Sequence, residues 1–186
     1  MEKNRLEAFS DGVLAIVITI MVLELKQPEG AGFADLMKLW PILGTYILSF
    51  LFVATYWVNH HMLFQKVERV NLKILWCNIA WLFVISLIPF TTAWVGVHPT
   101  SGMPLSIYFA DMALVSFTFH LMYNLIAAEH GQELTTKQKV RNYVSMGVYI
   151  LVAVLAGFCP IAAYVAVVVV TIWGIIPQKK EKRKSV

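Results

Sequence analysis

The sequence predicts an all-α integral membrane protein that crosses the bilayer with about six helices. Hydrophobic residues make up 59% of its 186 positions and charged residues 14%, whereas ordinary globular domains carry roughly 25% charged residues. The apolar residues gather in runs that approach the length of a membrane-spanning helix. Most Lys and Arg residues lie between these runs or in the tail, as membrane topology requires. So little polar material cannot cover a water-soluble domain of this size, and lipid removes that requirement.

Four long apolar runs come first, and each comes near the roughly 20 residues that a spanning helix needs. The second of them can continue as a helix to Gln65. The first is not a cleaved signal peptide, because Glu24, Lys26 and Pro28 follow its apolar core in place of a cleavage site. The four runs cover residues 6–25, 36–57, 72–95 and 105–128.

Two shorter apolar runs complete the set, at residues 143–158 and 161–176, and Gly157-Phe158-Cys159-Pro160 joins them. Glycine and proline there suit a tight turn between two antiparallel helices. A single broken helix over both runs is the alternative.

The orientation follows from the basic residues beside the helix ends. With six spans, thirteen of the fifteen Lys and Arg residues fall on one side, which leaves Lys26 and Lys38 on the other. We therefore expect both termini in the cytoplasm of a multi-pass protein of the cell membrane. Residues 1–186 are then one six-helix transmembrane domain with a short basic tail at 177–186, suited to anionic lipid. Because topology accounts for the net charge of +4, we expect no nucleic-acid partner.

Ionisable side chains inside the predicted spans are candidate functional groups, because each is costly in lipid. His60 and His61 could in principle hold haem or zinc. Adjacent residues of a helix point about 100° apart, however, so these two cannot share one ligand. Cys77 and Cys159 do not have the spacing of a metal site either, and the sequence has no phosphate loop or nucleophile motif.

We therefore predict no enzyme, no metal site and no cofactor, and we expect the buried polar groups to hydrogen-bond between helices. The alternative is a secondary transporter or a membrane enzyme that uses buried His and Asp groups such as Asp111 and His120.

The first helix opens with a motif, Arg5-Leu6-Glu7-Ala8-Phe9-Ser10-Asp11-Gly12. Arg-x-x-x-Phe-Ser-Asp at the start of an apolar first helix resembles the signature of the transmembrane protein 175 family, the lysosomal potassium channels and their bacterial relatives. The continuation at 12–19 also resembles the bacterial branch, as do Trp57-Val58-Asn59-His60-His61 and Leu87-Ile88-Pro89-Phe90-Thr91-Thr92. The resemblance covers at least the first three predicted helices.

This resemblance implies a potassium-permeable cation channel with six helices per repeat and a pore lined by the first helix. The chain has one Phe-Ser-Asp motif, so four chains would surround one pore as a homotetramer, with potassium ions and membrane lipids as its other partners. The sequence lacks the Thr-Val-Gly-Tyr-Gly filter of ordinary potassium channels. A hydrophobic constriction of side chains would stand in place of a carbonyl filter.

The resemblance also implies pore residues, at positions that match Ile16, Ile20 and Leu23. On a helix they fall at about 0°, 40° and −20°, with Thr19 at about −60° on the edge of this stripe. Asp11 falls near −140°, so we expect it to fix neighbouring helices and not to line the pore. Its candidate partners are Arg5, His60 or His61, Asn78 and Trp81.

Overall fold

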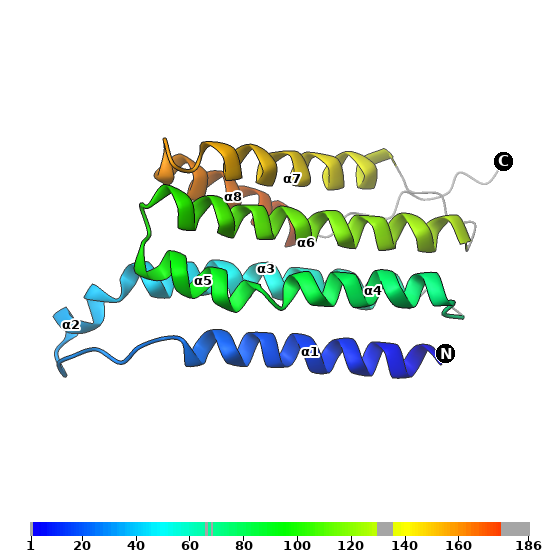
Figure 1. Cartoon of the computed structure of the whole chain (residues 1–186), viewed down its shortest axis with the longest axis horizontal. Coiled ribbons are helices and arrows are strands. Elements are labelled where there is room, and N and C mark those ends of the chain that lie inside the picture. The colour runs from blue at the N-terminus through cyan, green and yellow to red at the C-terminus, as the bar shows by residue number, and fades with distance from the viewer. Residues whose placement is uncertain (1, 66, 68, 130–135, 176–186) are drawn as a thin grey trace.

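The computed structural model describes residues 2–65, 67, 69–129 and 136–175. In this part of the chain the regular structure is entirely helical, and the helices lie side by side in one elongated bundle (Figure 1). The predicted tail at 177–186 lies outside the described residues. The helices are α1 (Lys3–Leu23), α2 (Phe33–Lys38), α3 (Trp40–Phe64), α4 (Leu72–Ile85), α5 (Ile88–Val97), α6 (Gly102–Glu129), α7 (Thr136–Leu155) and α8 (Pro160–Ile175).

Four segments are long and apolar enough to cross a membrane, which agrees with the four long runs of the sequence. Two shorter apolar helices, Tyr143–Leu155 and Pro160–Gly174, correspond to the last two predicted runs. The four long segments are Lys3–Leu23, Trp40–Phe64, Leu72–Val97 and Gly102–Glu129.

The second predicted run begins later and ends later than its apolar residues suggested. The predicted start at residue 36 is wrong, because residues 33–38 form the separate helix α2. The long helix α3 starts at Trp40, with a proline in its first turn, and runs to Phe64. The extension toward Gln65 is confirmed.

The third predicted run is two helices and not one. α4 ends at Ile85 and α5 begins at Ile88. Pro89 has no backbone N–H, so it cannot donate the helical hydrogen bond to the carbonyl of Ile85. Near this break the hydroxyl of Ser86 donates to the carbonyl of Phe83, at 2.6 Å. A single span therefore carries a break near its middle.

α7 and α8 form an antiparallel hairpin, and the alternative of one broken helix is wrong. The two helices pack against each other, and α7 also packs along α6 (Figure 1). Their turn approaches the start of α6 closely, since a Cβ atom added at Gly102 would lie 3.1 Å from the Cα atom of Gly157. Glycine at both positions permits this approach between the two backbones.

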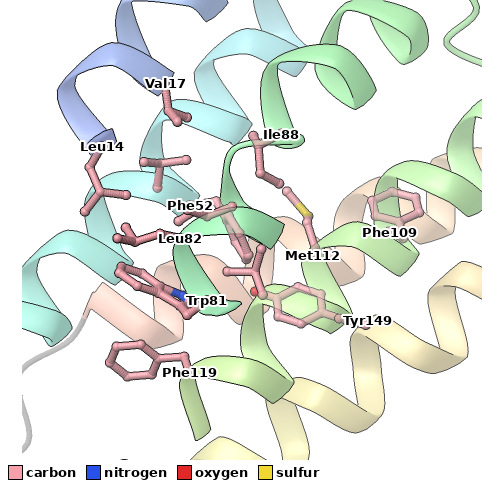
Figure 2. Packing of buried hydrophobic residues seen from close by; sticks show 14 of the residues in the cluster. Leu14, Val17, Phe52, Trp81, Leu82, Ile88, Phe109, Met112, Phe119 and Tyr149 are labelled. Carbon is pink, nitrogen blue, oxygen red and sulfur yellow. The ribbon is translucent and has the colours of Figure 1, made fainter. Parts of the chain in front are cut away.

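Aromatic residues from different helices meet at the centre of the bundle (Figure 2). The ring of Trp81 in α4 lies 5.6 Å from that of Phe119 in α6, and Phe52 in α3 lies 5.8 Å from Tyr149 in α7. From α1, Leu14 lies in the same buried cluster. This core holds one face of α1 in a fixed position against the rest of the chain.

Candidate functional site

One face of α1 is buried against its own bundle. Its buried residues recur at intervals of three or four, which places them on one side of a helix. This face packs against α3, α4 and α5. The residues are Leu6, Ser10, Leu14, Val17 and Met21.

The stripe of Ile16, Ile20 and Leu23 lies on a different side of α1 and is open. These side chains are 59%, 42% and 80% exposed in the single chain. Thr19 is exposed beside them, and its hydroxyl donates to the carbonyl of Ile16 at 2.8 Å. Its oxygen can still accept a hydrogen bond or contact a cation, because a hydroxyl has two lone pairs.

Ser10, Asn78 and His60 form a hydrogen-bonded chain across three helices. The hydroxyl of Ser10 donates to the carbonyl of Leu6 at 2.9 Å and accepts from the side-chain amide of Asn78 at 3.0 Å. The amide oxygen of Asn78 lies 2.8 Å from Nε2 of His60. All three side chains are buried. Because the Asn78 oxygen is an acceptor, this geometry assigns the Nε2 proton to His60.

Aromatic rings enclose His60. Its imidazole stacks on Trp81 with ring centres 5.0 Å apart and planes 11° from parallel, and Phe64 lies 4.5 Å away with its plane at 30°. Trp81 therefore meets this group through its ring face, and among the described residues its indole nitrogen has no hydrogen-bond partner. His61 is exposed and pairs with Gln65 at 2.9 Å. Of the two histidines, His60 is the one joined to the motif.

Asp11 has a partner that the sequence analysis did not name. Its Oδ1 atom accepts from the indole Nε1 of Trp57 at 2.8 Å. Trp57 lies one helical turn before His60, at a spacing that places both on one side of α3, and this spacing was the signal that could have found it. Arg5 and Phe9 lie exposed on α1, outside the buried group.

The interior holds a second polar group, of which the sequence analysis named only Asp111 as a candidate functional group. The hydroxyl of Thr92 donates to Ser49 at 2.7 Å, and Ser49 lies 2.8 Å from the hydroxyl of Tyr108. Asp111 accepts from Thr91 at 3.1 Å. These contacts join α3, α5 and α6, and hydroxyl groups give no periodic signal in an apolar sequence. Among the described residues, no group of three or more His, Cys, Asp or Glu side chains is placed to hold a metal ion.

Comparison with known proteins shows the family of this chain. A family profile described as "Endosomal/lysosomal potassium channel TMEM175" matches residues 5–89. A potassium channel of Chryseobacterium sp. (strain P1-3) is 41% identical over 184 residues, which cover 97% of this chain and 96% of that protein. The chain belongs to the TMEM175 family. This confirms the resemblance that the Arg-x-x-x-Phe-Ser-Asp motif indicated.

Two further TMEM175 relatives extend the comparison. A crystal structure of the "lysosomal potassium-selective channel TMEM175 homolog" from Chamaesiphon minutus has a TM-score of 0.81 and 28% identity, and the match covers 92% of this chain and 95% of that one. The rat "Endosomal/lysosomal proton channel TMEM175" is 29% identical over 118 residues, 61% of this chain and 23% of the rat protein. The family and these relatives are described as channels and not as enzymes, which agrees with the prediction that this chain is no enzyme.

Proposed function

We propose that this chain is a potassium-permeable cation channel whose pore is lined by α1. Its relatives from Chryseobacterium, Streptomyces collinus and Chamaesiphon minutus are named potassium channels. The observation that carries the proposal is the open stripe on α1. Ile16, Ile20 and Leu23 are exposed, although another side of the same helix is held in the core.

The channel is a closed ring of four identical chains. One α1 cannot enclose a pore, and symmetric rings are how identical subunits surround an axis. When four copies meet, each α1 presents its stripe to the axis while its buried face stays in its own bundle. Four side chains at each level then form successive rings along the pore.

The main barrier is the set of rings formed by Ile16, Ile20 and Leu23. Branched apolar side chains offer a cation nothing to replace its water, so a narrow apolar ring opposes conduction. Thr19 supplies hydroxyl oxygens beside these rings. Discrimination between potassium and sodium therefore rests on side chains and on the width of the constriction.

In the membrane the subunit is a single domain of six spans with both termini in the cytoplasm. The two shorter apolar helices at Tyr143–Leu155 and Pro160–Gly174 supply the fifth and sixth spans as a hairpin. The excess of Lys and Arg on one side supports this orientation. It places the outer end of the stripe, at Leu23, away from the cytoplasm of a cell membrane.

The test is flux from liposomes that contain the purified protein, with potassium and sodium gradients compared. We expect passive potassium flux that follows the gradient. A flux that saturates and requires a coupling ion would indicate a secondary transporter instead.

Substitutions on α1 make the test specific. Ile16→Asn shortens the apolar stretch and supplies amide oxygens, so it should raise conductance and reduce the potassium preference. Thr19→Val keeps the shape but removes the hydroxyl, so it should reduce the potassium preference while assembly is retained.

The matched control is Ile150→Asn. Ile150 is 51% exposed and lies on α7, at the opposite edge of the bundle from α1 (Figure 1). Ile18 would be a poor control, although it points away from the stripe, because it is partly buried against the core. If Ile150→Asn changed permeation while Ile16→Asn did not, α1 would not line the pore.

A further inference from the structure

The short helix α2 has an apolar side that its own chain leaves uncovered. Phe33, Leu36 and Met37 have the i, i+3, i+4 spacing of one helical face, and Trp40 follows at the start of α3. All four are exposed, and the outermost, Phe33, is 76% exposed. None of the residues of α2 is buried. Large apolar side chains exposed together in a segment that does not span the membrane indicate a binding surface.

The other side of α2 is charged. Asp35 and Lys38 form an ion pair there, with Nζ and Oδ1 2.8 Å apart. The linker that leads from α1 to α2 carries Glu24, Lys26 and Glu29, all exposed. The short helix therefore separates apolar from charged side chains along its length, as a helix at a boundary between lipid and water does.

The position of α2 matches such a boundary. α2 lies at the end of the bundle where α1 stops, beyond the ends of the long helices (Figure 1). Trp40 follows the apolar residues of α2 and lies in the first turn of the spanning segment Trp40–Phe64. Tryptophan is enriched where spanning helices leave the hydrocarbon. The apolar face of α2 is thus continuous with an exposed apolar surface of α3 that includes Ile47 and Phe50.

We propose that α2 is an interfacial helix whose apolar face lies in the lipid of the leaflet at this end of the bundle. Phe33, Leu36, Met37 and Trp40 enter the headgroup and acyl boundary, and the Asp35–Lys38 pair faces water. A free helix of this length would bind lipid weakly. Here α1 and α3 hold α2 beside the bilayer, so the effective concentration of lipid at its apolar face is high. The proposal holds whether or not the chain conducts ions.

Spin-label accessibility tests the proposal. Cys77→Ser and Cys159→Ser give a background without cysteine, and single variants Met37→Cys and Ala34→Cys then receive a nitroxide. In liposomes, oxygen dissolves preferentially in the bilayer and a nickel chelate stays in water. We expect the label at residue 37 to favour oxygen over the chelate several-fold more than the label at residue 34. Ile47→Cys provides the lipid reference, and Glu29→Cys provides the water reference.

Two results would overturn the proposal. A label at residue 37 that behaves like the one at residue 29 would put the face in water. A label that neither reagent reaches would mean that a protein surface covers it, such as a second copy of this chain.

A measurement without cysteine substitutions covers the case in which those variants fail to fold. Lipids brominated in the upper acyl chain quench tryptophan at that depth, and Trp40→Phe should remove part of the quenched emission. Equal quenching in Trp40→Phe and the parent chain would contradict the proposal.

Discussion

Asn78 joins two helices to a third through one side chain. Its amide group donates to Ser10 of α1 and its oxygen pairs with His60 of α3. Asn78→Leu keeps the approximate side-chain volume. It removes the hydrogen-bond partner of Nε2 of His60 and one of the two hydrogen bonds of Ser10 inside the core. We expect the free energy of unfolding in detergent to fall by about 1–3 kcal/mol for each buried group left unsatisfied. Asn124→Leu is the control, since Asn124 is half-buried on α6 and its side chain makes no hydrogen bond to any of the described residues. Equal losses in both variants would contradict this role.

Asp11 and Trp57 act as one pair. Because one hydrogen bond joins them, Asp11→Ala and Trp57→Phe should each weaken folding or assembly and leave the ratio of potassium to sodium flux unchanged. The double variant should be little worse than the more damaging single variant, since contacting residues are not additive. Thermal stability and liposome flux of all three variants provide the measurement. A well-assembled Asp11→Ala channel with altered ion preference would argue that Asp11 faces the pore.

The limits of prediction differ from residue to residue. The motif drew attention to Ser10 and Asp11, and helical spacing separated Asp11 from the stripe of Ile16. Spacing did not find Trp57, because an indole at a helix end also reads as an interfacial tryptophan. It also could not choose between His60 and His61, which differ only by the rotation of α3 and by the rings packed around it.

At the scale of elements, the long apolar runs located the long helices because lipid requires every backbone group to be bonded within its own helix. The apolar runs did not locate two helix boundaries, which individual residues determine. Pro89 divides the third run into α4 and α5, although proline inside a membrane helix often only kinks it. α2 separates from α3 at Leu39, and Pro41 in the first turn of α3 is the local signal of the new start.

The contact between the start of α6 and the α7–α8 turn allows a further test. Gly102→Ala would place a Cβ atom 3.1 Å from the backbone of Gly157, so two backbones must separate. We expect a destabilisation of about 1–3 kcal/mol, as for other overpacked sites. Gly147→Ala is the matched control, because a Cβ atom there meets nothing within 4 Å. The melting temperature in detergent should fall for Gly102→Ala and stay equal or rise for Gly147→Ala.

At the scale of the whole molecule, the prediction is a tetramer. The stripe on α1 is exposed in one chain, and we expect it to surround the axis of a ring of four chains. Mass measurement in mild detergent, or cross-linking in liposomes, should give four chains per particle. A monomer that still conducts potassium would refute the closed ring.

Reporter fusions at the two termini should both report the cytoplasm, and opposite locations would refute the six-span arrangement.

α1 is attached unevenly along its length. The side-chain hydrogen bonds that tie it to α3 and α4 lie at Ser10 and Asp11, whereas Leu14, Val17 and Met21 hold its C-terminal half through apolar packing. Apolar packing tolerates small displacements of a helix, whereas a hydrogen bond is lost when its two atoms move apart. We therefore expect α1 to be held most firmly near its N-terminal end and to allow the largest displacement at Leu23. The linker to α2 joins α1 there. If α2 lies in the lipid as proposed, tension in the bilayer would act on the end of α1 that is farthest from its hydrogen bonds at Ser10 and Asp11.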